Sequence, residues 1–378
     1  MALFTALIGL KISFAAAHVD HSWRPESGVE AEELKDLCSR ANVPFYLKKL
    51  PKREDEGWCR EQRLLFFHHI CTEQGCQAVM LGHQRQDQAQ TTLKRLLEGA
   101  RLEKLAGMNP VSCREGLVLW RPLLDVPKKD LISYLGKVKF FLDSSNDNSK
   151  FLRPRLAQKL IPALEAHFGK SIDGPLRQIS SDAHELSLWI AEEAGRFPKL
   201  SGPLGTLLDF TKDELPSRFL LKRLIAGSLE DEGHLVSHNV LNLAADALQS
   251  GRINYYINKN IYIDRRRLFS LAKDYGRGCW TLTTHPASSK ALTTSWKDLW
   301  RGSGMAVLPK LPYTLQYVDA NRLAKRWSQE AVPPLFRKSV PVLTYQGRIV
   351  HEFLSGRKQG SDEEIWAVQL EYQKAPVI

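Results

Sequence analysis

Two histidines, an aspartate, a tryptophan and an arginine lie close together in residues 18–27 (HVDHSWRPES). An apolar run at residues 12–17 precedes them, and such a run predicts a buried strand. Ligands bind outside the carboxyl ends of the strands in open parallel sheets. This stretch therefore indicates a ligand-binding site, with the candidates His18, Asp20, His21 and Arg24. A polar loop that satisfies its own backbone is the alternative. We expect no metal site, because side chains alternate along a strand and His21 then faces away from His18 and Asp20.

A second polar cluster, residues 82–91 (GHQRQDQAQT), follows the apolar strand expected at residues 78–82 and opens a helix. Asp87 falls near the start of that helix, where the helix dipole favours a carboxylate. Asp87 is thus either a helix cap or a ligand for a cationic or hydroxyl group of a substrate. His83 and Gln90 belong to the same cluster.

Arginines occur at two further places where a guanidinium group could bind phosphate. Arg60 and Arg63 are one turn apart on a predicted helix and form either a solvated basic face or a phosphate contact. Arg153 and Arg155 open another predicted helix, after a Ser/Asn/Asp-rich loop at residues 143–148. That loop is typical of helix capping, and the two arginines could close over a phosphate.

Strands and helices alternate through residue 168, and they must position these residues. The expected strands are 12–17, 43–47, 78–82 and 117–120, and the expected helices are 1–7, 30–41, 59–74, 88–98, 128–135 and 153–168. This alternation predicts a doubly wound, mostly parallel α/β sheet in a nucleotide-binding domain, residues 1–168. A mainly helical domain at residues 169–285 and a small α+β domain at residues 286–378 are expected to follow.

The net charge of +11 is concentrated in one third of the chain. Residues 252–378 contain 20 Lys and Arg against 10 Asp and Glu, a net of +10. Such a basic region usually binds a polyanion, most often nucleic acid, although a merely basic soluble domain is the alternative.

Membrane insertion and secretion are not expected. No apolar run reaches the ~18 residues of a membrane span, and Lys11 interrupts the apolar N-terminus, unlike a secretory signal. The six cysteines form no C-x-x-C pair, so we expect reduced thiols and a cytoplasmic protein.

The ordered set of motifs resembles the tRNA(Ile)-lysidine synthetases, members of the N-type ATP pyrophosphatase (PP-loop) superfamily. The residues that carry the resemblance are HVDHSWRPES, CREQR, GHQRQDQAQT, LAGM at 105–108, RPLLDV at 121–126, LDSSNDNSKFLRPR and residues 327–356. Residues near 170–290 match poorly. The resemblance implies that ATP adenylates the C2 oxygen of the wobble cytidine in tRNA(Ile) with a CAU anticodon. The ε-amine of L-lysine then displaces AMP and gives lysidine, with Mg²⁺ neutralising the phosphates.

The resemblance also implies roles for individual residues. The implied catalytic residues are Arg63, His83 and Asp87, and the implied nucleotide-binding residues are His18, Asp20, His21 and Arg24. The implied substrate-binding residues are Gln90, Arg153 and Arg155. In the basic C-terminal domain, our candidates for tRNA backbone contacts are Arg322, Arg337 and Lys338. The sequence leaves open whether the protein forms a homodimer.

Two departures from the family pattern affect these expectations. The Gly-rich S-G-G-x-D-S loop, which cradles phosphates, is absent, and the chain begins one residue after the point where that motif would end. We therefore expect the α/β sheet to lack the first strand of the family fold. We expect a start codon upstream and a complete enzyme; the alternative is an inactive homologue that only binds tRNA. Gln86 and Gln90 replace acidic residues, and Gln90 thereby loses the charge that would pair with a lysine ammonium group.

Overall fold

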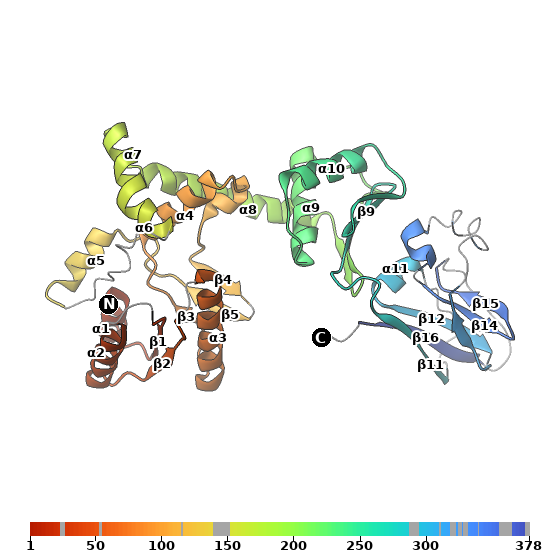
Figure 1. Ribbon diagram of the computed structural model, residues 1–378, viewed down its shortest axis with the longest axis horizontal. Coiled ribbons are helices and arrows are strands. Elements are labelled where there is room, and N and C mark those ends of the chain that lie inside the picture. Colours follow the sequence, from red (N-terminus) through yellow and green to blue (C-terminus); the bar gives the residue numbers. More distant parts are fainter. Residues whose placement is uncertain are drawn as a thin grey trace. The chain divides into compact units, whose positions relative to one another are not determined.

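A computed structural model describes residues 1–22, 27–52, 55–114, 116–138, 152–286, 295–309, 311–317, 323, 327, 332–338, 340–354 and 365–374. The chain divides into two compact units, Met1–Trp189 and Ile190–Ile378 (Figure 1). The finer division into three domains stays a prediction.

Unit 1 alternates helices with short strands, as expected. Its elements are α1 (Ala2–Gly9), β1 (Ala16–Asp20), α2 (Ser27–Arg40), β2 (Phe45–Lys49), α3 (Glu56–Gln74), β3 (Val79–Met80), α4 (Arg85–Leu97), η1 (Leu102–Ala106), β4 (Val111–Arg114), β5 (Leu117–Trp120), α5 (Lys128–Leu135), α6 (Leu152–Arg155), η3 (Leu156–Leu160), α7 (Ile161–Phe168) and α8 (Asp173–Gly195), whose last residues belong to unit 2.

Parallel pairing joins β1 to β2 and β3 to β5, and β4 adds to β5 in the antiparallel sense. The first strand lies about four residues later than the apolar run suggested. Ile12 is 42% exposed, and the pairing with β2 begins only at Ala16. His18 and Asp20 are therefore part of β1 itself, which ends at the expected cluster.

Helix α3 covers both pieces of sheet in unit 1. Asp55 caps its start by accepting the Trp58 N–H at 3.0 Å, and Gly75 ends it in the left-handed conformation (φ 64°). Its buried side chains, Cys59 and Phe67 among them, form one core with Val19 of β1 and with Leu117 and Leu119 of β5. This shared core holds the strand ends and α3 in one arrangement.

The single helix expected at residues 153–168 is interrupted. Residues Leu156–Leu160 form a π-helical segment between α6 and α7. Pro162 near the start of α7 lacks an N–H and cannot complete the α-helical hydrogen bond to the residue four positions earlier. A wider turn at this point accommodates the missing bond.

Unit 2 contains more sheet than the sequence suggested. Its elements are β6 (Lys199–Gly202), β7 (Gly205–Asp209), α9 (Arg218–Asp231), α10 (His238–Gln249), β8 (Tyr255–Asn258), β9 (Ile261–Asp264), β10 (Arg267–Leu271), β11 (Cys279–Pro286), α11 (Trp296–Trp300), β12 (Ser303–Pro309), β13 (Thr314–Gln316), η4 (Pro334–Lys338), β14 (Val342–Tyr345), β15 (Arg348–Glu352) and β16 (Ile365–Gln373).

A five-stranded antiparallel sheet runs in the order β6-β7-β10-β9-β8, and its three central strands are buried on both faces. Leu208 and Leu268 point into a core with α9 and α10, whereas their neighbours Leu207 and Phe269 point into the core of the C-terminal part. The alternation of strand side chains places successive residues on opposite faces. The C-terminal part of unit 2 therefore packs directly on this sheet.

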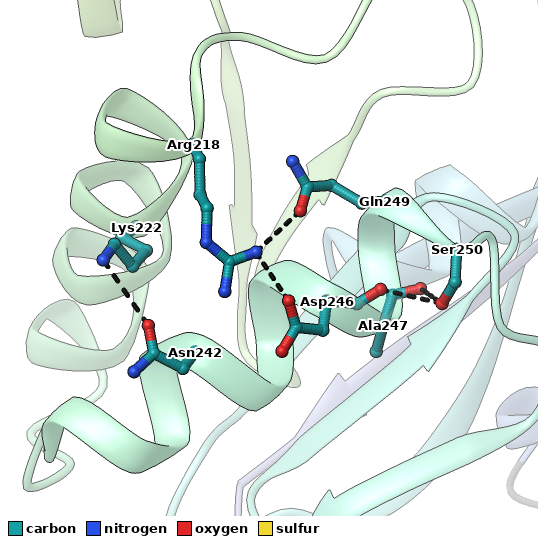
Figure 2. Close-up of polar contacts among 7 residues, drawn as sticks. All are labelled: Arg218, Lys222, Asn242, Asp246, Ala247, Gln249 and Ser250. Carbon is teal, nitrogen blue, oxygen red and sulfur yellow. Dashed lines mark hydrogen bonds and ion pairs between the residues drawn. The ribbon is translucent and has the colours of Figure 1, made fainter.

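Polar contacts join α9 to α10 on the outside of that core (Figure 2). Arg218 Nη1 lies 2.5 Å from Asp246 Oδ1 and donates to Gln249 Oε1 at 2.7 Å. One turn further along α9, Lys222 Nζ donates to Asn242 Oδ1 at 3.4 Å. These contacts align the two helices over the sheet.

Candidate functional site

The carboxyl end of β1 is organised by Asp20. This side chain is 4% exposed, and its Oδ1 accepts the Ser22 N–H at 2.7 Å. Ser22 has a positive φ of 53°, and its hydroxyl donates to Leu50 O at 2.9 Å. Burial acts to raise the pKa of Asp20, but hydrogen bonds from Ser27 and Ser22 outweigh it and leave the pKa below its usual value. Asp20 is thus an anion that holds the chain as it leaves the strand.

His21, the residue after β1, lies near Arg63 of α3. Burial, and then the positive charge of Arg63, lower the pKa of His21, and burial likewise lowers that of His18. Both imidazoles are therefore neutral at neutral pH. The structure brings His18, Asp20, His21 and Arg63 close together, and their roles in binding and catalysis stay predictions. Arg24 lies outside the described residues.

The second cluster begins helix α4, and its polar side chains cap the helix. Asp87 Oδ2 accepts the Gln84 N–H at 2.9 Å, while Gln84 Oε1 accepts the Gln86 N–H at 3.1 Å. Of the two roles considered for Asp87, the cap is the one present in the structure; its role as a ligand stays a prediction. His83 and Gln90 are both half-buried beside this cap.

Side chains at the start of α4 also hydrogen-bond to the RPLLDV segment and to the start of α5. Arg85 Nε donates to Asp125 O at 2.9 Å, and Gln86 Oε1 accepts the Lys128 N–H at 3.0 Å, where α5 begins. The amide of Gln86 thus serves as a backbone acceptor, a task that needs no negative charge.

Sequence reasoning missed a clamp that one face of α4 forms on the LAGM segment. Gln88 Nε2 donates to Ala106 O at 2.7 Å and to Ser180 Oγ of α8 at 2.8 Å, and Gln88 Oε1 accepts the Met108 N–H at 2.8 Å. Thr92 Oγ1 adds a bond to Leu105 O at 3.3 Å. The polar residues 88, 92 and 95, spaced along one helical face, were the available signal.

Three arginines from different elements lie close together in unit 1. Arg95 of α4 donates to Gly107 O at 2.8 Å, and Arg121, which follows β5, donates to Asn109 O at 2.8 Å. Burial, and then the charge of Arg60 on α3, lower the pKa of both guanidinium groups. The exposed Arg60 is therefore near two other positive charges, and such a cluster attracts anions.

The other predicted arginines are placed less completely. Arg153 and Arg155 lie in α6, and Arg155 is exposed. Arg337 of η4 is half-buried and donates from Nη2 to Val332 O at 3.2 Å, and Lys338 lies in the same short helix. Arg322 lies outside the described residues. The roles of these residues in binding substrate or tRNA stay predictions.

Within the described part of the chain, no three His, Cys, Asp or Glu side chains are grouped so that they could hold a metal ion. None of the helices described there is both long enough and apolar enough to span a bilayer.

Strand ends bearing polar side chains, flanked by helices, are the setting in which α/β nucleotide-binding domains place their ligands. Residues 1–164 match the PP-loop domain family, which confirms the expected fold class. A tRNA(Ile)-lysidine synthase from Protochlamydia amoebophila is 31% identical over 408 residues, covering 96% of this chain and 88% of that protein. The chain belongs to the tRNA(Ile)-lysidine synthase family, as the motifs indicated.

Other relatives match over shorter stretches. The tRNA(Ile)-lysidine synthase of Chlamydia caviae is 40% identical over 193 residues, covering 49% of this chain and 61% of that protein. That of Chlamydia trachomatis serovar L2 is 34% identical over 250 residues, covering 64% and 78%. A solved structure, the U34-tRNA thiolase NcsA from Methanococcus maripaludis with its [4Fe-4S] cluster, covers 54% of this chain and 70% of its own at 13% identity and a TM-score of 0.37, a likeness too slight to bear on function.

Proposed function

We propose that this chain ligates L-lysine to C2 of the wobble cytidine in tRNA(Ile) with a CAU anticodon, consuming ATP and releasing AMP and pyrophosphate. The observation that carries the proposal is the 31% identity to a tRNA(Ile)-lysidine synthase over 96% of the chain. An inactive homologue that only binds tRNA is less favoured, because the similarity extends through the polar strand ends as well as the basic C-terminal part.

The chemistry requires that an oxygen at C2 become a leaving group. Transfer of the adenylyl group of ATP to that oxygen releases pyrophosphate, and attack by the neutral ε-amine of lysine then expels AMP. The nucleophilic amine must lose a proton, so a neutral imidazole near the reacting atoms is useful. His18 and His21 are held neutral by burial, and Arg63 beside His21 is suited to an oxygen that gains negative charge.

Mg²⁺ binds phosphate oxygens with only one or two protein carboxylates, so the site needs no cage of protein ligands. The metal ion would neutralise the phosphates of ATP. Arg60, with Arg95 and Arg121 behind it, supports binding of a polyanion on the same unit.

Further features of the proposal go beyond the family assignment. We propose that lysine is the amino acid that is ligated and that Arg322, Arg337 and Lys338 contact the tRNA. We also propose that the chain has three domains, with boundaries near residues 168 and 285, and that the protein is cytoplasmic. A homodimer is a separate hypothesis that light scattering tests.

The test measures incorporation of labelled lysine into a tRNA(Ile) transcript with a CAU anticodon, with and without ATP. The matched control is the same transcript with guanosine in place of the wobble cytidine. We expect ATP-dependent incorporation only into the CAU transcript. The assay uses this chain and the product of any longer in-frame reading of its gene. Salt-sensitive tRNA binding without incorporation by either protein would favour the tRNA-binding alternative.

A further inference from the structure

Two cysteines meet where helix α3 ends. Cys71 lies in the last turn, Gly75 adopts the left-handed conformation, and Cys76 follows it. The backbone N–H groups of Gly75 and Cys76 both point back to Cys71 O, the latter at 2.9 Å. The Cys76 bond is the one that marks a Schellman-type helix end, in which the residue after the glycine folds back over the residue four positions before the glycine.

The side chains at those two positions of a Schellman end usually make an apolar contact. Here both are thiols, and the side chain of Cys76 hydrogen-bonds to that of Cys71. Burial, and then the neighbouring Cys76 thiol, raise the pKa of Cys71. Cys71 is half-buried against the core below α3, whereas Cys76 is exposed.

The other cysteines are placed differently. Cys38 and Cys59 are buried, and Cys113 and Cys279 are exposed on β4 and β11. Cys71 and Cys76 differ from these cysteines because the backbone folds one back toward the other and their thiols interact. A disulfide requires closely spaced Cα atoms and converging side chains, and the folded-back helix end brings the two cysteines into one turn of backbone.

We propose that Cys71 and Cys76 are a modification site that forms a reversible intramolecular disulfide by exchange with a small-molecule disulfide such as oxidised glutathione. The thiolate of the exposed Cys76 attacks one sulfur of glutathione disulfide and releases one glutathione thiolate. The Cys71 thiol loses its proton, attacks the Cys76 sulfur and releases the second glutathione. Two protein thiols are oxidised, one disulfide is reduced, and two protons pass to the released thiolates.

Burial raises the pKa of the Cys71 thiol, which slows the second step of this exchange because the attacking species is the thiolate. The extent of oxidation follows the ratio of glutathione disulfide to glutathione around the protein. Because the helix end is already folded back, cross-linking needs no change in the φ of Gly75.

The test treats the full chain with oxidised glutathione, alkylates the remaining thiols, and identifies the peptides by mass spectrometry. We expect the peptide that contains both cysteines to escape alkylation, to be lighter by two hydrogen atoms, and to recover its thiols with reductant. Hydrogen exchange at residues 71–76 should slow in the oxidised protein.

Three variants separate this proposal from ordinary thiol reactivity. Cys71→Ser should retain glutathione on Cys76, because no second thiol is in reach to release it. Cys76→Ser should leave Cys71 largely unmodified, and the control Cys113→Ser should form the cross-link as the unaltered chain does. A lasting glutathione adduct on Cys76 of the unaltered chain, or a disulfide between two chains through Cys76, would overturn the proposal.

Discussion

Asp87 accepts the backbone N–H of Gln84 on its Oδ2 atom at 2.9 Å, so the carboxylate that the family pattern marks for catalysis also caps helix α4. The same turn of helix holds Asp125 through Arg85 and the start of α5 through Gln86. A change at Asp87 therefore acts on helix stability and on substrate at once, and the two effects need separate measurements.

Asp87→Asn separates them. Asparagine keeps an oxygen that can accept the Gln84 N–H, so we expect the free energy of unfolding to fall by less than ~1 kcal/mol. If the carboxylate contacts the lysine ammonium, the KM for lysine should rise by about tenfold or more, since charged hydrogen bonds contribute about 1.5–3 kcal/mol. Asp87→Ala removes the cap as well and serves as the comparison. An unchanged KM in the asparagine variant would limit Asp87 to capping.

Gln88→Met tests the clamp between α4, the LAGM segment and α8. Methionine has a similar shape, but it leaves the Met108 N–H and other buried groups without Gln88 as their partner. We expect a loss of about 2 kcal/mol or more in the free energy of unfolding, measured by urea denaturation. The matched control is Gln178→Met, because Gln178 bonds to Asp182 on the exposed face of α8 and should matter little. Equal losses in both variants would contradict the clamp.

Gly107 makes a second test of the same clamp. Its φ is +70°, and a Cβ atom there would lie 2.7 Å from Gln88 Oε1. Gly107→Ala should therefore destabilise unit 1 by about 1–3 kcal/mol through strain and displacement of Gln88. Gly99→Ala also has a positive φ (69°) but meets nothing within 4 Å, so the difference between the two variants measures the displacement. Indistinguishable losses would mean that Gln88 moves aside freely.

Arg63→Gln should raise the pKa of His21 toward its ordinary value of about 6.5. Burial is the larger cause of the lowered pKa and remains, so the recovery is partial. The measurement is an NMR pH titration of isotope-labelled histidine side chains. Arg60→Gln should leave the pKa of His21 in place, because Arg60 is near Arg95 and Arg121 instead. If both variants gave the same histidine titration, the placement of Arg63 of α3 beside His21 would be wrong.

Arg60→Gln should weaken tRNA binding and reduce the dependence of log Kd on log salt concentration by about one unit. Removal of Arg60 also relieves its repulsion with Arg95 and Arg121, so the weaker binding would not come from unfolding. The control is Arg40→Gln, an exposed arginine on α2 that bonds to Asp36 O. A salt dependence equal to that of the control would place Arg60 outside the tRNA footprint.

Asp209 should make unit 2 sensitive to acid. Burial acts to raise its pKa, but Lys297 at 2.7 Å, Thr211 and Arg267 outweigh this and lower the pKa to about 2. Because the folded pKa lies below the unfolded value of about 3.9, the contribution is full above that value and is lost as the pH falls toward 2. Asp209→Asn should cost about 2 kcal/mol at pH 6, and this difference should shrink between pH 4 and pH 2, measured by urea denaturation at each pH.

The matched control for Asp209 is Asp231, whose ion pair with Lys199 is exposed. Exposed pairs contribute about 0–1 kcal/mol, so Asp231→Asn should change little at any of these pH values. A difference between Asp209→Asn and the unaltered chain that stays constant with pH would contradict the lowered pKa.

Local patterns were sufficient for most elements of unit 1, although they missed β4 and the π-helical segment between α6 and α7. Apolar runs separated by amphipathic segments predicted alternating strands and helices, Gly75 marked the end of α3, and the charge of Asp87 marked the start of α4. These features depend on residues a few positions apart, and the physical preferences involved act at that range. The motif order was likewise enough to identify the family.

Which strands pair, and which helices pack against them, is determined only by the tertiary structure. The start of β1 depends on the strand beside it. The strands of the five-stranded sheet in unit 2 are short segments that become stable only when paired and packed. Gln88 bonds to a helix 92 residues away. The closeness of Arg60 to Arg95 and Arg121, and of His21 to Arg63, likewise arises when α3 packs across the strand ends. Periodicity and composition indicate which side chains are buried or need a hydrogen-bond partner. Which partner each side chain contacts is determined only in the folded chain, because it depends on burial and hydrogen bonding between segments that are distant in sequence.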